Sequence, residues 1–228
     1  EATANTGRLR QTFASLTSGV TSTFSLFAKL GTQSSGVTLV FQEGNATSYS
    51  SGVCQSFRLD TGAVGTSGTL GAGFTITRSN IENYGNGWYR CSLTVQLSYT
   101  PSSANLTIRP TSVVTANLPV TASGDSCYIF GAQLETGTVP TSYIPTTTAS
   151  ATRNADNISL SGAVSGCVGQ TEGTIYAEVD IRSFVTFSRI VSLSNGTSSN
   201  TINLQLFLDG AVKRLRVGLT FLGSGQVD

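Results

Sequence analysis

Two carboxylates lie two positions apart at Glu178 and Asp180. Polar and apolar side chains alternate over residues 173–181, and this alternation predicts a β-strand. On a strand, the two carboxylates would point to the same face, about 6.6 Å apart along the chain. Glycoside hydrolysis requires a pair of carboxylates, so Glu178 and Asp180 are the first candidates for catalysis.

Other catalytic chemistries lack the residues they need. The chain has no histidine, so a serine or cysteine nucleophile would have no imidazole base. Only Lys29 and Lys213 could replace that base, and neither lies in a nucleophile motif. The glycine-rich segment 62–73 lacks the Gly-Lys-Ser/Thr ending of a phosphate-binding loop. Outside the carboxylate pair we therefore expect no catalytic residues, and we expect no cofactor and no metal site.

Three aromatic residues could bind a sugar. Trp88 and Tyr89 are adjacent, and Tyr84 precedes them in a predicted turn. The apolar face of a pyranose ring stacks on an exposed aromatic side chain, so all three are candidate glycan contacts. The alternative is that Trp88 packs in the core or at the rim of a sheet. Tyr49 and Tyr99 lie in or beside predicted loops and are weaker candidates.

The composition narrows the class of protein. Charged residues make up 11% of the chain, against about 25% in a typical soluble domain. The net charge is +1 with no long basic run, which argues against nucleic-acid binding. No apolar run is long enough for a membrane span, and no signal peptide is evident. A low charge with abundant Ser, Thr, Gly and Asn suits a β-rich extracellular or virion-surface protein.

Short alternating segments predict an all-β protein. Eight strands are expected before residue 135 and none of the segments has a helical period, which is typical of a sandwich or jelly roll. The expected strands are residues 11–16, 21–30, 37–42, 54–60, 74–81, 88–97, 105–109 and 126–134. In the last of them, Tyr128, Phe130, Ala132 and Leu134 share one face, which we expect to be buried, and Gly131 permits a bulge.

Two prolines after that strand indicate a domain boundary. Pro140 and Pro145 cannot donate ladder hydrogen bonds, so we expect a stiff connector there. The predicted domains are a jelly roll over 1–145, a linker over 146–156 and the start of a second sandwich over 157–228. The strands expected in the second sandwich are residues 156–160, 173–181, 188–194, 201–208 and 212–220.

The second sandwich is expected to be incomplete. The chain has no methionine, so we expect Glu1 to lie inside a longer protein, and the carboxyl end to be cut as well. An apolar face is left without a covering sheet, and downstream residues or further copies of the chain would have to cover it. The face consists of Leu193, Leu204, Leu206, Leu208, Leu215, Val217 and Leu219.

The four cysteines, Cys54, Cys91, Cys127 and Cys167, show neither the spacing of a zinc site nor the density of a disulfide scaffold. We expect free thiols. Cys91 and Cys127 lie within predicted strands, where a thiol behaves as a small buried apolar group.

A longer pattern resembles a known family. The sequence YIFGAQLETGTVPTSYIPT, followed by ATRNADNISL, is similar to a junction in bacteriophage tail and tail-fibre proteins. In that family, a sandwich resembling a carbohydrate-binding module is followed by a concanavalin A-like, laminin-G-like sandwich. NGWYRCSLTV at residues 86–95 and GTIYAEVDI at 173–181 extend the resemblance over most of the chain.

The resemblance also bears on catalysis and on calcium. In glucanases with the concanavalin A-like fold, a Glu-x-Asp-x-Glu strand supplies the catalytic groups, but Arg182 stands at the third place here. That difference removes the proton donor. Modules resembling the first sandwich often bind calcium through an aspartate in the last strand, and Phe130 and Gly131 occupy the matching positions. Asp125 could still be a ligand.

Together, these patterns predict a structural virion protein of a phage tail or capsid surface, made in the host cytoplasm, that can bind cell-surface glycans and is not an enzyme. Its partners would be other virion proteins and copies of itself, and the resemblance favours a trimer. An alternative is an accessory binding region of a polysaccharide-degrading enzyme whose catalytic domain lies outside these residues. A spacer without a ligand is a third interpretation, since this type of fold hosts all three roles.

Overall fold

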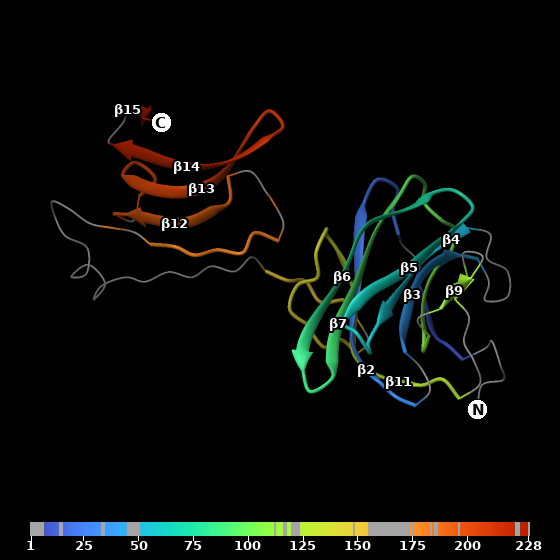
Figure 1. The fold of residues 1–228 in the computed structure, drawn as a ribbon. Helices are drawn as coiled ribbons and strands as arrows, with labels where there is room; N and C mark the ends of the chain where they lie inside the picture. Colours follow the sequence, from blue (N-terminus) through green and yellow to red (C-terminus); the bar gives the residue numbers. More distant parts are fainter. Residues whose placement is uncertain are drawn as a thin grey trace. The chain divides into compact units, whose positions relative to one another are not determined.

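The computed structural model describes residues 7–13, 16–32, 35–44, 51–111, 113–115, 118–119, 124–147, 149–154, 174, 176–182, 184, 187–195, 197–221 and 224–227. In this part of the chain every regular element is a β-strand (Figure 1), which confirms the predicted all-β class. The chain divides into two compact units, Glu1–Ala151 and Thr152–Asp228.

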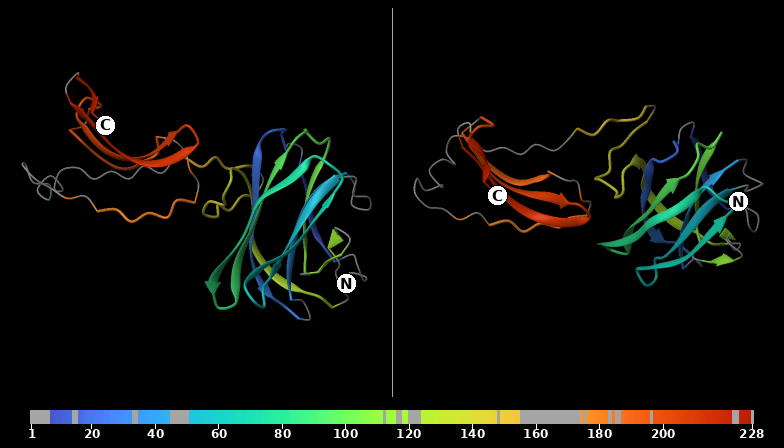
Figure 2. Two further views of the ribbon diagram at one scale, coloured as in Figure 1. Left: turned by 45° about the horizontal axis from the view of Figure 1, so that its top comes forward. Right: turned by 90° about the horizontal axis from the view of Figure 1, so that it is seen from above.

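The first unit is a sandwich of two antiparallel sheets (Figure 2). One sheet has the order β1 (Leu9–Phe13), β8 (Ala104–Arg109), β3 (Gly36–Glu43), β4 (Ser51–Arg58) and β5 (Ala63–Leu70). The other has the order β11 (Cys127–Thr136), β2 (Thr21–Leu30), β7 (Trp88–Leu97) and β6 (Phe74–Gly85). A small pair, β9 (Val114–Thr115) and β10 (Leu118–Pro119), lies in the connection before β11. Strands distant in sequence are neighbours in both sheets, as in a jelly roll.

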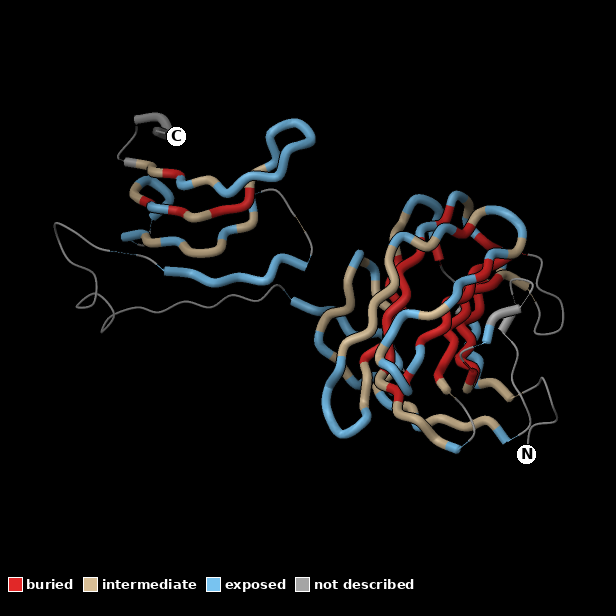
Figure 3. The backbone as a smooth tube through the Cα atoms, in the orientation of Figure 1, coloured by how far each residue is buried: buried red, intermediate tan, exposed pale blue. Residues whose placement is uncertain are grey.

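The core lies between these two sheets and follows from the alternation of side chains. In β2, which follows the predicted strand 21–30, Phe24, Leu26 and Ala28 point inward and are buried, while Phe27 and Lys29 lie on the outer surface. In β3, Val37, Leu39 and Phe41 are fully buried in the same cluster. Buried residues are concentrated in this unit (Figure 3).

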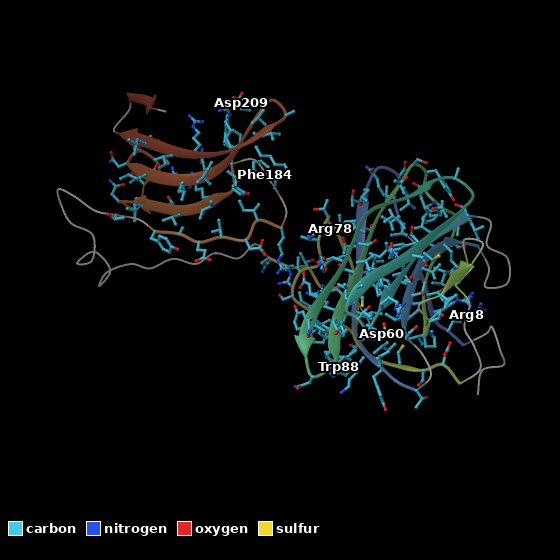
Figure 4. All side chains as sticks on the ribbon, in the orientation of Figure 1. Arg8, Asp60, Arg78, Trp88, Phe184 and Asp209 are labelled. Carbon is cyan, nitrogen blue, oxygen red and sulfur yellow. The ribbon has the colours of Figure 1, made fainter. Side chains whose placement is uncertain are left out.

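The hairpin between β6 and β7 forms as predicted. Gly85 pairs with Trp88, which leaves Asn86 and Gly87 as a two-residue turn. Both turn residues have positive φ values, 51° and 78°. Two positive φ values define the type I′ turn that Asn-Gly favours, and its twist matches that of the strands. The turn places Trp88 at the start of β7 (Figure 4).

Strand β11 differs from the prediction in which face is buried. Its register against β2 shifts between Phe130 and Gln133, and Gly131 lies in this bulge with φ of 61°. Before the bulge, Ile129 packs on the core, whereas Tyr128 and Phe130 are 63% and 60% exposed. The expectation that Tyr128 and Phe130 are buried is therefore wrong. A bulge adds one residue to a strand and reverses its alternation, so Ile129 and Leu134 both reach the core.

Strand β5 was not predicted, because residues 63–70 read as a glycine-rich loop. It is an edge strand paired only with β4, and most of its side chains are exposed. Such a strand needs no apolar face, so the sequence carries no period-two signal. The first strand is also displaced: β1 ends at Phe13, whereas residues 11–16 were expected.

The second unit contains one antiparallel sheet in the described part of the chain. Its order is β12 (Arg189–Ser194), β13 (Thr201–Asp209), β14 (Val212–Phe221) and β15 (Ser224–Val227). The first three strands follow the predicted segments. Cross-strand pairs such as Leu204 with Val217 and Leu206 with Leu215 gather the predicted apolar residues on one face. The predicted strand 156–160 lies outside the described residues.

Much of that apolar face is open to solvent in this chain. Leu215 is 60% exposed and Val217 is 56% exposed, and Leu208 is exposed as well. Leu206 is the exception, since it is buried. In this unit, the exposed aliphatic groups form a surface that a further protein layer would stabilise by removing it from water.

Candidate functional site

The carboxylate pair is not organised as a catalytic site. Thr174 and residues 176–181 belong to no strand, so the predicted strand 173–181 is wrong in the described positions. Polar and apolar side chains do alternate here, but Val179 and Ile181 are exposed. Alternation alone does not form a β-strand, because the strand also needs backbone hydrogen bonds to a neighbouring strand.

The neighbours of the two carboxylates support the same conclusion. Asp180 pairs with Arg182 at 3.0 Å, and Glu178 accepts a hydrogen bond from the hydroxyl of Tyr176 at 3.3 Å. All of these side chains are exposed. Glycoside hydrolysis needs two carboxyl groups that flank the scissile bond of a bound sugar, whereas both of these carboxylates are exposed and Asp180 is held by an arginine.

Within the described residues, no group of three or more His, Cys, Asp and Glu side chains is placed to hold a metal ion. Asp125, the remaining candidate for a calcium ligand, is half-buried at the entrance to β11. The described part of the chain also contains no helix that could cross a membrane.

Aromatic side chains gather on the outer surface of the sheet β11-β2-β7-β6. We call this surface the aromatic face. Its members come from all four strands and from the connector that follows β11, and they are Phe27, Tyr84, Trp88, Tyr128, Phe130 and Tyr143. Tyr84 is 55% exposed, and Trp88 is half-buried beside the turn (Figure 4).

The rings in the middle of the aromatic face form a continuous chain. Phe27 lies edge-on to Tyr84, with ring centroids 5.0 Å apart, and 6.1 Å from Phe130 on the other side. Phe130 in turn meets Tyr143 at 5.3 Å. These separations are typical of attractive aromatic pairs. Each ring therefore fixes the orientation of the next, and the surface they form is largely preorganised.

Strand register places a second row beside these rings. Trp88 pairs with Lys29, and Lys29 pairs with Tyr128 on its other side. All three side chains point outward, because Ala28, Tyr89 and Ile129 next to them point toward the core. Neighbouring strands are about 4.8 Å apart, so the backbones of Trp88 and Tyr128 are about 10 Å apart, with Lys29 between them.

The connector after β11 covers the other end of the same sheet surface. The Thr23 hydroxyl donates to the carbonyl of Gly137 at 2.8 Å, and the Arg90 guanidinium donates to the carbonyl of Thr141. The backbone N–H of Thr141 donates to the Glu135 carboxylate at 2.9 Å, and that of Ile144 donates to the Gln133 side chain at the same distance. These hydrogen bonds attach the connector to the first unit.

This connector explains why polar residues on an outer surface are buried. The buried polar side chains of this surface are Thr23, Ser25, Arg90, Ser92 and Thr94. They lie in the region where the connector packs, and Arg90 also lies over the Phe27 ring at 5.3 Å. The aromatic face lies beside this covered region, and Tyr143 of the connector packs on Phe130 within that face.

The predicted glycan contacts are only partly brought together. Trp88 and Tyr84 belong to the aromatic face, but Tyr89 points to the opposite side of β7 and packs on the core. The hydroxyl of Tyr99 donates to the Glu43 carboxylate, and its ring packs on Phe74, a structural arrangement. Tyr49 lies outside the described residues.

Sequence reasoning missed four members of the aromatic face, Phe27, Tyr128, Phe130 and Tyr143, and also missed Lys29 beside them. Tyr128 and Phe130 were assigned to the core because the strand was read without its bulge. Gly131 was the available signal, since a bulge there places Ile129 and Leu134 on the same face and turns Tyr128 outward.

Cys54, Cys91 and Cys127 are free thiols in the structure, and Cys167 lies outside the described residues. Burial raises the pKa of Cys54 and of Cys127 to about 11, and it also raises the pKa of Cys91. Since the thiolate is the reactive form, all three thiols are protected in the folded protein.

We expect these three thiols to react slowly with iodoacetamide at pH 8 in the folded protein and quickly in guanidinium chloride. Peptide mapping by mass spectrometry would measure each site separately. The same shifts should lower the free energy of unfolding as the pH rises from about 9 toward 11, because the thiols ionise first in the unfolded chain. Rapid native alkylation of Cys91 would contradict this account.

No protein-family model matches this chain, and no curated protein matches it either.

Proposed function

We propose that the first unit is a glycan-binding module of a structural bacteriophage protein, such as a tail fibre, a tail-associated protein or a head fibre. The observation that supports glycan binding is the exposed aromatic face on the sheet β11-β2-β7-β6. The resemblance of the segment around Pro140 and Pro145 to phage tail proteins supports the virion assignment.

The aromatic face suits a sugar better than an apolar ligand. Its exposed rings, Tyr84, Tyr128 and Phe130, lie on the two strands β6 and β11 and form an open surface. A pyranose ring can lay its C–H groups on such a ring while its hydroxyls keep hydrogen bonds with water or with nearby polar groups. Trp88 and the two tyrosines also bring N–H and O–H groups that can bind hydroxyls.

The second unit suits assembly. The aliphatic face around Leu215 and Val217 is exposed in the single chain. Copies of the same chain, arranged around it as the resemblance favours, would cover that face within a virion. The protein would then be made in the host cytoplasm and act on the outside of the phage tail or capsid, with other virion proteins as partners and no role for nucleic acid.

The alternative function is an accessory binding region of a polysaccharide-degrading enzyme, with catalysis outside these residues. The same aromatic face would serve there, so the remainder of the open reading frame distinguishes the two. A hydrolase domain would favour the enzyme, whereas neighbouring virion-assembly genes would favour the fibre.

Glycan binding is tested with an array of bacterial surface polysaccharides and fluorescently labelled protein. We expect wild-type protein to bind, and Tyr128→Ala to lose about tenfold or more in affinity, since stacked aromatic residues dominate such sites. Tyr176→Ala is the matched control, because Tyr176 is 83% exposed and belongs to the second unit. Equal losses in both variants, or binding unaffected by Tyr128→Ala, would refute the site.

A further inference from the structure

Lys29 lies between two aromatic side chains of the aromatic face. It pairs with Trp88 on strand β7 and with Tyr128 on strand β11, and all three side chains point outward. We call these residues the Trp88–Lys29–Tyr128 row. An ideal Cβ on Gly87 would lie 3.4 Å from Cε of Lys29, so the lysine stem runs beside the turn after β6. A pyranose stacked on Tyr128 or Trp88 would therefore lie close to a positive charge.

The Lys29 ammonium group has no partner within the described part of the chain. It makes no ion pair and no hydrogen bond there. The acidic side chains of the same sheet surface are already engaged. Glu135 accepts from the backbone N–H and the hydroxyl of Thr141, and Glu82 accepts from the side chain of Asn80 at 3.0 Å.

Strand register also separates Glu82 from Lys29. Glu82 is the cross-strand partner of Arg90, in the neighbouring row. No acidic side chain lies in the Trp88–Lys29–Tyr128 row itself. A half-buried lysine between aromatic rings, with no acidic side chain in its row, can donate hydrogen bonds to an anionic group of a ligand stacked on those rings.

We propose that the aromatic face binds glycans that carry a carboxylated sugar, such as a hexuronic acid, with the sugar ring stacked on Tyr128 or Trp88 and its carboxylate bonded to Lys29. This inference rests on the proposed glycan binding and adds the class of ligand. Lysine presents its three donors on a flexible stem, so it can follow carboxylates in several positions on a ring. The aromatic rings supply affinity, and Lys29 selects acidic over neutral sugars.

The test uses acidic polysaccharides, polygalacturonate and alginate among them, each paired with its carboxyl-reduced form. Calorimetry with the full chain would measure both members of each pair. We expect carboxyl reduction to weaken binding about tenfold, the usual worth of a charge-assisted hydrogen bond at a partly exposed site. Added salt should weaken binding of the acidic member and leave the neutral member unchanged, because salt screens exposed charges.

Two lysine variants make the test specific. Lys29→Gln should abolish the preference, so that the acidic and the neutral member of each pair bind equally. Lys213 is the only other lysine of the chain and lies in the second unit, so Lys213→Gln is the matched control and should keep the preference for the acidic member. Equal binding of both members by wild-type protein, or a preference that survives Lys29→Gln, would overturn the inference and leave glycan binding intact. Failure to bind either member of any pair would count against the proposed function as well.

Discussion

Replacing Phe41 with alanine should lower the free energy of unfolding of the first unit by about 3–5 kcal/mol. Phe41 is fully buried at the centre of the sandwich, and its ring meets Phe24 edge-on at 6.3 Å. Removing the ring leaves a cavity between two sheets that are each held by their own ladders and cannot close around it. Urea unfolding followed by circular dichroism would measure the loss.

Tyr128→Ala is the control for that measurement. Tyr128 is 63% exposed, so its replacement should change the free energy of unfolding by no more than about 0.5 kcal/mol. The same variant then enters binding experiments as a folded protein. A loss below about 1 kcal/mol in Phe41→Ala would mean that the core between the two sheets is not packed as described.

The second large effect is expected at Arg90, which holds the connector on the sheet. Its guanidinium donates to the Ser25 hydroxyl at 3.2 Å and to the carbonyl of Thr141, and it lies over the Phe27 ring. Arg90→Ala removes the buried donor and the packing of the stem together. We expect the free energy of unfolding to fall by about 2–4 kcal/mol, as for other losses of a buried hydrogen-bonding network.

Hydrogen exchange gives the local readout for this variant. The backbone N–H groups of Gly137, Thr141 and Ile144 are hydrogen-bonded in the structure and should lose protection in Arg90→Ala. Arg58→Ala is the control, since Arg58 is an exposed partner of Asp60, and surface ion pairs contribute at most about 1 kcal/mol. Unchanged protection at Thr141 and Ile144 would show that the connector is held without Arg90.

The fold was predictable from the sequence where the local residue pattern, such as alternation or a turn dipeptide, matches the burial of the side chains in the structure. Strand β2 alternates sharply enough that the burial of Phe24 and Leu26 and the outward direction of Phe27 follow from the sequence. The turn at Asn86 and Gly87 follows from the need for two positive φ values. The same turn places Tyr84 and Trp88, two of the three predicted glycan contacts, at one end of the sheet.

The parts that were missed depend on pairing and on distant contacts. Strand β5 is an edge strand of small polar residues, so only its partner β4 defines it. Residues 176–181 show the reverse, a strand pattern without a ladder. Tyr143 reaches the aromatic face because the connector folds back onto the sheet, held by Arg90 and Glu135. No local pattern encodes that return.

The bulge at Gly131 shows how one residue changes the functional interpretation. The sequence indicates that Gly131 permits a bulge, but the predicted burial of Tyr128, Phe130 and Leu134 on one face assumes that side chains alternate without interruption along the strand. The register shift turns Tyr128 and Phe130 toward solvent and sends Leu134 to the core. The aromatic face exists because of that shift.

The most direct test of glycan binding uses Trp88, the only tryptophan in the chain. Because Trp88 lies on the aromatic face, its fluorescence and its indole N–H resonance report on that surface alone. Titration with a polysaccharide that binds should give a saturable change at Trp88, with the same Kd that calorimetry measures, and Tyr128→Ala should weaken both together. Tight binding that leaves the Trp88 signal unchanged would place the ligand elsewhere and contradict the assignment.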